Sequence, residues 1–178
     1  MTSEHWDERH AQKEGPGQPS SFVTVELAPL LPDQGRAVDV AGGRGRHSHW
    51  LADRGWEVTL VDFSTVALES VADERIVKIE ADLESDLFPE GPWDLALIVH
   101  YLDRALVPTM IAHLSPGGLV AFAIATERNL ERHDRPALPY LLRPGEAPEL
   151  VTGMRLLYYA EGWSVEGRHE ARVVAARR

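Results

Sequence analysis

The stretch RAVDVAGGRGRHSHWLADRGWEVTLVDFS, residues 36–64, decides the fold that this sequence predicts. It reads as a β-strand, a glycine-rich turn over 41–45, a helix over 46–54 and a second strand over 58–61. The turn has no bulky side chain except Arg44, so its backbone can bend sharply and let a ligand approach closely. A strand, turn, helix and strand in this order indicate an open α/β sheet.

Three carboxylates come at the ends of predicted strands. Asp39 lies at the end of the first strand, Asp62 at the carboxyl end of the second, and Asp82 just after a third strand over 76–80. Open α/β sheets bind ligands at the carboxyl ends of their strands, so we expect the three acids to share one rim and one ligand. A single acid in such a place is usually a solvated loop residue, but three in a repeating pattern favour a site.

The strongest signal for a buried strand in the chain is WDLALIVH at residues 93–100. A continuous apolar run is typical of the centre of a parallel sheet that is covered on both faces. This strand delivers His100, Tyr101 and Arg104 to the rim that carries the acids, which makes them the candidate catalytic residues. The alternative is that they are surface or packing residues, the more common role for such side chains.

The C-terminal third predicts the closing elements of the sheet. A helix is expected to end near Leu114, followed by a turn at 115–118 and a fifth strand at 119–125. Residues 126–143 show no clear period and contain two prolines, which predicts a structureless loop of the kind that is usually functional or mobile. The expected elements after it are a helix over 144–152 and strands over 154–160 and 168–175, spaced as an antiparallel hairpin.

Two helices are expected before the first strand. One covers residues 3–13, and the other begins at a capping serine, Ser20 or Ser21, and ends near Pro29. Together they predict a lid over the glycine turn. Trp6 either anchors this lid on the core or contacts the ligand, and the sequence leaves both readings open.

The size and composition of the chain argue against several classes of partner and site. A chain of 178 residues is expected to form one domain, and its net charge of −10 opposes a nucleic-acid partner, which is bound mainly by neutralising phosphates. No apolar run approaches the roughly 20 residues of a membrane span, and no secretory leader is visible, so we expect a cytoplasmic protein without a membrane partner. The absence of cysteine excludes disulfides, cysteine nucleophiles and thiolate metal sites, and no metal site is expected.

The segment DVAGGRGRH, residues 39–47, resembles the acid-x-Ala-x-Gly-x-Gly-Arg loop of class I S-adenosylmethionine-dependent methyltransferases, in the branch of tellurite-resistance and thiopurine-type enzymes. The resemblance covers nearly the whole chain, from Trp6-Asp7-Glu8-Arg9 to the closing RHEARVVAARR. It implies an α/β, three-layer Rossmann-like fold with a seven-stranded mixed sheet and an antiparallel C-terminal hairpin. The single domain, 1–178, would then comprise a helical lid (1–33), a cofactor-binding core (36–125), and a substrate loop with the closing hairpin (126–178).

The resemblance also implies how S-adenosylmethionine is bound. Asp39 would orient the loop and the amino group of the cofactor, Asp62 would hold the ribose hydroxyls, and Asp82 would accept from the adenine amino group. The implied cofactor-binding residues are Trp6, Arg9, Asp39, Ala41, Gly42, Gly43, Gly45, Arg46, Asp62, Phe63, Ser64, Asp82 and Leu83.

Two positions depart from the pattern of that branch. Gly42 stands where cysteine is frequent, and we expect it to make the loop more flexible without abolishing binding. His47 stands where asparagine is frequent, which puts the family contact at this position in doubt.

The implied function is methyl transfer from S-adenosylmethionine to a small-molecule acceptor, with a thiol or a chalcogen oxyanion as the acceptor that this branch suggests. Methyl transfer asks for little covalent help, because the sulfonium is already activated and the protein mainly holds the acceptor in line. One alternative is a non-catalytic module that binds S-adenosylmethionine or a nucleotide. A nicotinamide-dependent oxidoreductase is a weaker alternative, since Ser48 stands where the dinucleotide fingerprint has its third glycine. The sequence leaves open whether the protein is a monomer or a homodimer.

Overall fold

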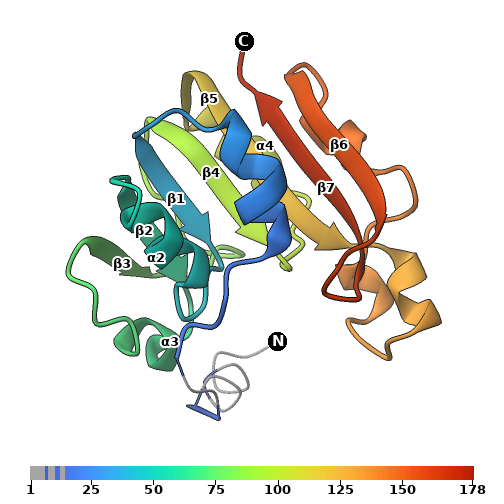
Figure 1. The fold of residues 1–178 in the computed structure, drawn as a ribbon, viewed down its shortest axis with the longest axis horizontal. Helices are drawn as coiled ribbons and strands as arrows, with labels where there is room; N and C mark the ends of the chain where they lie inside the picture. The colour runs from blue at the N-terminus through green and yellow to red at the C-terminus, as the bar shows by residue number, and fades with distance from the viewer. Residues whose placement is uncertain (1–6, 8–10, 13–14) are drawn as a thin grey trace.

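The computed structural model of the chain describes residues 7, 11–12 and 15–178. Seven strands form one mixed sheet in the order β3-β2-β1-β4-β5-β7-β6, as Figure 1 shows. The strands β1 to β5 pair in parallel, and β7 runs antiparallel to both β5 and β6. The strands are β1 (Arg36–Val40), β2 (Glu57–Asp62), β3 (Ile76–Glu80), β4 (Trp93–Val99), β5 (Leu114–Ala125), β6 (Arg155–Trp163) and β7 (His169–Ala176).

The helical elements within these residues are short. The α-helices are α2 (Arg46–Ala52), α3 (Thr65–Glu69) and α4 (Leu106–Ala112), and a π-helix forms η1 (Phe22–Leu27). The 3₁₀-helices are η2 (Ala28–Leu30), η3 (Glu127–Glu131), η4 (Leu138–Tyr140) and η5 (Ala147–Val151). Among the helices of the described residues, none combines the length and apolar character that crossing a bilayer requires.

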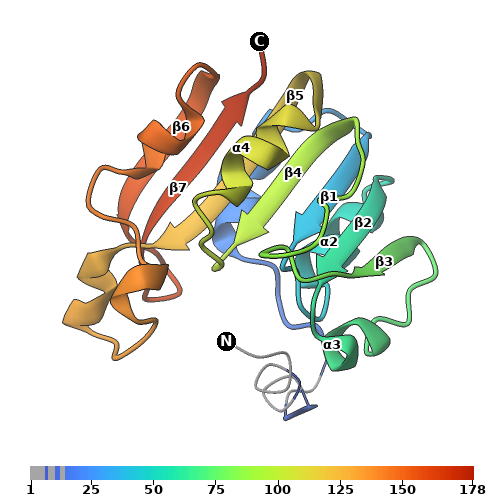
Figure 2. The ribbon, with the colours of Figure 1, turned by 180° about the vertical axis from the view of Figure 1, so that it is seen from behind.

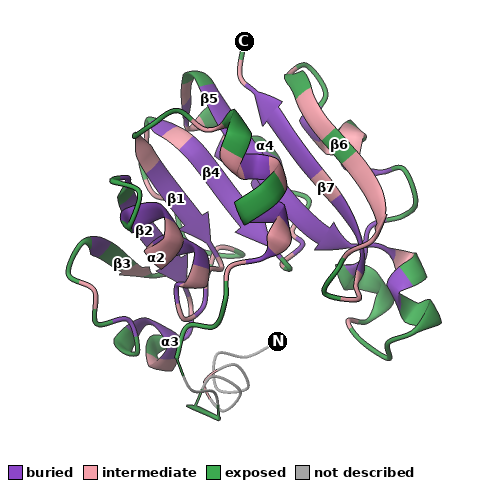
Figure 3. Cartoon of the chain, viewed as in Figure 1, coloured by how far each residue is buried: buried purple, intermediate pink, exposed green. Residues whose placement is uncertain are grey.

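Hydrophobic side chains cover both faces of the sheet, which confirms the three-layer architecture expected from the sequence. Along β4, Leu95 and Leu97 join one cluster with η1 and α2, while Ala96 and Ile98 join a second cluster with α4. This alternation follows from the two-residue period of a strand. Figure 1 shows η1 and α2 on the near face, and Figure 2 shows α4 on the other. In Figure 3, β1, β4 and β7 are largely buried, whereas the edge strand β6 is half-buried.

The N-terminal helix expected over 3–13 lies mostly outside the described residues. The second expected helix is present as a π-helix, but no serine side chain caps it. Ser21 instead donates from its backbone N–H and its hydroxyl to the carboxylate of Glu166, at 2.7 and 3.0 Å. The predicted cap was therefore wrong, because a contact between residues far apart in the sequence satisfies this serine. Glu26 of η1 also pairs with Arg172 of β7 at 2.6 Å, which fixes η1 on the sheet.

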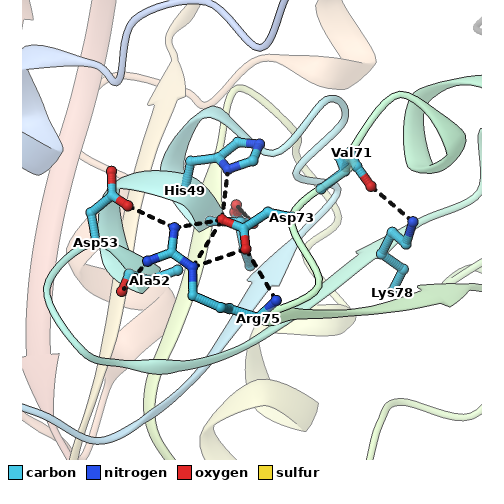
Figure 4. Close-up of polar contacts among 9 residues, drawn as sticks. His49, Ala52, Asp53, Val71, Asp73, Arg75 and Lys78 are labelled. Carbon is cyan, nitrogen blue, oxygen red and sulfur yellow. Dashed lines mark hydrogen bonds and ion pairs between the residues drawn. The ribbon is translucent and has the colours of Figure 1, made fainter.

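An ion-pair cluster holds the end of α2 against the connection from α3 to β3 (Figure 4). Arg75 contacts Asp73 at 2.6 Å and Asp53 at 2.8 Å, and His49 Nδ1 lies 3.4 Å from the same Asp73 oxygen, Oδ2. Hydrogen bonds from Arg75 hold the pKa of Asp73 well below its ordinary value. Since α2 begins at the glycine turn, this cluster also steadies the candidate site.

Two predictions about the C-terminal third were wrong in detail. The expected turn at 115–118 belongs to β5, because Gly117 and Gly118 exchange backbone hydrogen bonds with Arg177 beyond the end of β7. The expected structureless loop over 126–143 is ordered into η3 and η4. The backbone N–H of Glu127 donates to the carbonyl of Leu142 at 2.8 Å, so the two ends of the segment are tied together.

The predicted closing hairpin is confirmed. The strands β6 and β7 pair from Arg155↔Ala176 to Trp163↔His169, so β6 is slightly longer, β7 is shifted by one residue, and their turn is shorter than the sequence suggests. The preceding helix, expected over 144–152, is the single 3₁₀ segment η5.

Candidate functional site

The glycine turn after β1 is bound directly to the end of β2. The backbone N–H of Gly43 donates to Asp62 Oδ2 at 2.8 Å, and the N–H of Gly42 donates to the carbonyl of Val61 at 3.3 Å. Gly43 and Gly45 have φ values of 57° and 74°, a backbone region that favours glycine. The turn can therefore bend in this way because glycine stands at these positions.

Gly42 has a packing role that the sequence does not show. A Cβ added at this position would lie 2.4 Å from Leu60 Cδ1 and 2.7 Å from Asp39 Cγ, distances that real Cβ atoms do not show. Any larger residue here would have to displace Leu60 or Asp39, so close packing favours glycine, whereas the sequence predicted only a more flexible loop.

We expect Gly42→Ala to lower the free energy of unfolding by about 1–3 kcal/mol, the usual effect of overpacking. The added methyl group must displace Leu60 or the Asp39 carboxylate, so affinity for S-adenosylhomocysteine should fall as well. Urea denaturation and calorimetric titration measure the two effects. Gly153→Ala is the matched control for added bulk, because a Cβ there meets nothing within 4 Å, although its φ of 90° also strains alanine. Equal stability of wild type and Gly42→Ala would contradict the packing argument.

Asp39 is a buried carboxylate that is only half satisfied. Ser48 Oγ donates to Asp39 Oδ2 at 2.7 Å, whereas Oδ1 is buried and has no hydrogen-bond partner in the described part of the chain. Burial raises the pKa of Asp39 to about 6, against the hydrogen bond from Ser48 and the positive charge of Arg46, which lower it. A buried acceptor without a partner is costly to keep, so Oδ1 is suited to a donor that arrives with a ligand.

Asp62 links the glycine turn to the start of α3. Its Oδ2 accepts from Gly43, and its Oδ1 accepts from the backbone N–H of Ser64 at 2.9 Å. A carboxylate offers about four acceptor positions, so capacity is left for further donors. Ser64 caps α3 by accepting from the N–H of Ala67, and its hydroxyl donates to Asp7 at 2.5 Å.

Asp82 lies on the same edge of the sheet but in a different setting. The N–H of Ala81 donates to the carbonyl of Asp62 at 3.1 Å, which brings the end of β3 beside the end of β2. Asp82 is exposed, and its Oδ1 accepts from the backbone N–H of Glu84 at 3.0 Å. Asp39 and Asp62 are close enough for their charges to interact, whereas Asp82 stands further out with Leu83 half-buried beside it.

His100 follows β4 in a strained conformation, with a φ of 65° that is rare for residues other than glycine. Its Nδ1 lies 3.2 Å from Arg46 Nη2, and its Nε2 lies 3.3 Å from Glu170 Oε2. Burial lowers the pKa of His100, and the hydrogen bond to the Glu170 carboxylate opposes that shift without cancelling it. The imidazole is therefore neutral at pH 7 and has the proton affinity of a weak base.

Tyr101 and Arg104 also follow β4, but their chemical properties differ from those of His100. Arg104 forms a two-point ion pair with the buried Glu146, at 2.5 and 2.9 Å, and donates to the carbonyl of Leu141 at 2.9 Å. This hydrogen bonding lowers the pKa of Glu146 to about 2. Burial, followed by the charge of Asp103, raises the pKa of Tyr101 to about 12, so its phenol stays protonated.

We expect Arg104→Ala to lower the free energy of unfolding by about 1–3 kcal/mol, because, among the described residues, it leaves the buried Glu146 with only Arg143, whose guanidinium lies 3.4 Å away, as a charged donor. The affinity for S-adenosylhomocysteine should not change, since the ion pair holds the segment around Leu141 and not the glycine turn. Chemical denaturation and calorimetry measure the two quantities. Arg128→Ala is the control, because its ion pair with Glu131 is exposed on both sides. A stability loss no larger than that of Arg128→Ala would argue against a stabilising role for the ion pair between Arg104 and Glu146.

Trp6 and Arg9 lie outside the described residues, so their predicted contacts with the cofactor stay predictions. Asp7, which lies between them in the sequence, is described, and its contact with Ser64 places Asp7 at the start of α3. Two functional contacts were not predicted from the sequence: that of Ser48 with Asp39 and that of Glu170 with His100. Glu170 could have been noticed as a glutamate among the small and β-branched residues of β7, HEARVVAA.

Other features of the surface lie away from this edge. A hollow lined by Gly91, His113 and Arg177 lies near the start of β4, the end of that strand opposite to His100. Within residues 7, 11–12 and 15–178, no group of three or more histidine, aspartate or glutamate side chains is placed to hold a metal ion.

A family model described as a methyltransferase domain matches residues 12–159. No curated protein matches the chain. TehB from Haemophilus influenzae superposes with a TM-score of 0.73 at 17% identity, over 88% of this chain and 62% of that one, so the chain spans less than two thirds of TehB. The glycopeptide N-methyltransferase MtfA in complex with S-adenosylhomocysteine superposes with a TM-score of 0.69 at 18% identity, over 94% and 93% of the two chains. An S-adenosylmethionine-dependent methyltransferase from Mesorhizobium loti gives 0.69 at 20% identity, over 85% and 96%.

Proposed function

This chain belongs to the methyltransferase domain family, and we propose that it transfers a methyl group from S-adenosylmethionine to a small-molecule acceptor. Enzyme class and cofactor follow from the family, and the fold agrees with solved methyltransferases. The acceptor and the role of each residue are the parts that we propose. MtfA has been solved with S-adenosylhomocysteine and with sinefungin, which supports the choice of those ligands as probes.

The observation that carries the proposal is the free oxygen of Asp39. S-adenosylmethionine presents an ammonium group and a sulfonium, and an unpartnered buried carboxylate oxygen is a suitable acceptor for a cationic donor. Asp62 keeps acceptor capacity for the ribose hydroxyls, and the amide of Gly43 ties that carboxylate to the turn. The residues at this edge therefore fit the cofactor.

The remaining predicted contacts are part of the same proposal. Phe63 is half-buried beside Asp62 and suits one face of the adenine, while the exposed Asp82 and the backbone of Leu83 suit its edge. Trp6 and Arg9 would close over the cofactor from the N-terminal segment, which the contact between Asp7 and Ser64 supports. The other proposed contacts come from the glycine turn and the starts of two helices: Ala41, Gly42, Gly43, Gly45, Arg46 and Ser64.

S-adenosylmethionine, when bound, supplies a methyl group on a positively charged sulfur. The chain has to exclude water and hold the acceptor in line with that methyl group. We propose that His100 contacts the acceptor, because it is neutral and stands at the end of β4 on the site's edge. Tyr101 can donate a hydrogen bond but is a poor base, and Arg104 acts by holding the segment around Leu141.

A thiol or a chalcogen oxyanion is the acceptor suggested by the resemblance to tellurite-resistance enzymes, and the superposition on TehB supports it at the level of the fold. An amine is a second candidate, supported by the fold of the N-methyltransferase MtfA. A cytoplasmic location and the absence of a nucleic-acid partner stay predictions.

The test has two steps. Calorimetry should show that S-adenosylhomocysteine binds and that oxidised nicotinamide dinucleotide does not, and the opposite result would favour the oxidoreductase. The release of S-adenosylhomocysteine from S-adenosylmethionine is then followed with a panel of thiols, selenite, tellurite, amines and phenols. Binding without release for every acceptor of the panel would favour the non-catalytic module.

A further inference from the structure

Glu170 is a buried carboxylate that the cofactor site does not use. Its side chain is 4% exposed, and it is followed in β7 by the fully buried Ala171 and Val173. Burying a carboxylate is costly unless it is paired. In the part of the chain that the structure describes, its side-chain partner is His100, with 3.3 Å between Glu170 Oε2 and His100 Nε2.

The two neighbours of His100 select one tautomer of its ring. Arg46 can only donate, so Nδ1, 3.2 Å from its guanidinium, must accept. A carboxylate accepts, so Nε2 must carry the hydrogen that points to Glu170. A neutral imidazole satisfies both partners only as the Nε2–H form, with its lone pair on Nδ1.

We propose that Glu170 is a positioning residue that holds His100 as the Nε2–H tautomer, so that Nδ1 removes the proton from the methyl acceptor. This inference rests on the proposed function and narrows the chemical class of the methyl acceptor. The substrate is a nucleophile that still carries a proton at neutral pH, such as an amine, a phenol or a thiol, and not a preformed oxyanion.

The proposed step is balanced in protons and electrons. The acceptor atom forms its bond to the methyl carbon with its own electron pair and gives its proton to Nδ1 of His100. The carbon–sulfur bond breaks with its pair staying on sulfur, which leaves a neutral thioether. Glu170 then stabilises the positive charge on the ring, as a carboxylate does behind a catalytic histidine. Arg46 must turn away from Nδ1 first, which fits its proposed contact with the cofactor.

The charges around His100 come from three elements. Glu170 faces it from β7, Arg46 and His47 from α2, and Arg168 from the turn before β7. Burial is the main reason that its pKa is low, and both arginines lower it further, while Glu170 raises it. His47 is itself neutral, because burial brings its pKa to about 3. Removing the charge of Glu170 should therefore lower the pKa of His100.

Nitrogen NMR of the imidazole rings tests the inference without an acceptor. In the wild type, we expect His100 to show a protonated Nε2 and an unprotonated Nδ1, both free and with S-adenosylhomocysteine. The His100 pKa should be lower in Glu170→Gln and should return toward the wild-type value in Glu170→Asp. It should stay unchanged in the control Glu161→Gln, whose carboxylate contacts Gly145 and Tyr159.

A kinetic measurement adds a second readout. With any amine, phenol or thiol that the wild type methylates, Glu170→Gln should lower kcat by about tenfold or more, within the range of general-base effects, and move the acid limb of the pH profile to lower pH. An Nδ1–H tautomer in the wild type, or a His100 pKa that Glu170→Gln leaves unchanged, would overturn the inference while S-adenosylhomocysteine still binds. If S-adenosylhomocysteine did not bind the wild type, the proposed function would be overturned instead. Turnover of selenite or tellurite but of no protonated acceptor would also overturn the inference.

Discussion

Asp39→Asn is expected to weaken the binding of S-adenosylhomocysteine by about 10- to 100-fold and, at the same time, to stabilise the free protein at pH 7. Binding weakens because the variant removes the charge that we propose pairs with the ligand's ammonium group. Stability rises because the wild type must keep a buried carboxylate ionised although its Oδ1 has no described partner. Opposite effects on binding and stability are typical of a residue kept for function.

The size and sign of the stability effect follow from the pKa. Burial raises the pKa of Asp39 from 3.8 to about 6, a difference of roughly 3 kcal/mol at 1.36 kcal/mol per unit. A raised carboxyl pKa means that the folded state holds the proton more tightly than the unfolded state. The wild type therefore gains stability as pH falls from about 6 to about 4, and Asp39→Asn does not. We expect the variant to be more stable by about 1–2 kcal/mol at pH 7, since the new amide also lacks a partner, and to lose this advantage near pH 4.

Urea denaturation at pH 7, 5 and 4, without ligand, measures this effect. Calorimetry at the same pH values should show that the wild-type affinity falls by up to tenfold for each pH unit below about 6, because the ligand binds the ionised carboxylate. Ser48→Ala is an informative second variant, since losing the hydrogen bond to Oδ2 should raise the pKa of Asp39 further. If Asp39→Asn destabilised the protein at pH 7 and bound ligand normally, Asp39 would be a structural residue.

Asp62→Ala is expected to weaken both binding and stability. Affinity for S-adenosylhomocysteine should fall by about 1–3 kcal/mol, since the ribose hydroxyls lose their acceptor. The free energy of unfolding should also fall by about 2 kcal/mol or more, because the amides of Gly43 and Ser64 lose the carboxylate that satisfies them.

The same two measurements, calorimetry and urea denaturation, apply to Asp62→Ala. The exposed Asp33 gives the matched control, and Asp33→Ala should change neither quantity. Asp62→Asn separates the effect on ligand affinity from the effect on stability, since its amide oxygen can still accept one backbone hydrogen bond. Wild-type affinity in Asp62→Ala would remove this residue from the proposed site.

The parallel α/β pattern and the rim that carries Asp39 and Asp62 were predictable from the sequence, because they depend on local patterns. A short strand, a glycine turn and a helix define a parallel unit by themselves, and the apolar run at 93–100 predicts a buried central strand. The pairing of that strand with β1 became visible only in the structure. The boundaries of β5 were not predictable in this way. They depend on hydrogen bonds between Gly117, Gly118 and Arg177, which are far apart in the chain.

The details of the site required the structure. In the sequence, Ser48 counted only as a missing glycine, but it donates the hydrogen bond that holds Asp39. Glu170 meets His100 across 70 positions of the chain, so no local pattern could join them. The order of residues 126–143 likewise depends on Asn129, whose buried side chain accepts from the N–H of His169 and donates to the carbonyl of Arg135.

A crystal structure of the protein with S-adenosylhomocysteine tests the central claim most directly. The account predicts the ligand at the carboxyl ends of β1, β2 and β3, with its ribose hydroxyls on Asp62 and its amino group on Asp39 Oδ1. Density for the ligand at the opposite end of the sheet, for example in the hollow by Gly91 and His113, would contradict it. So would a bound ligand that leaves both carboxylates without a new contact.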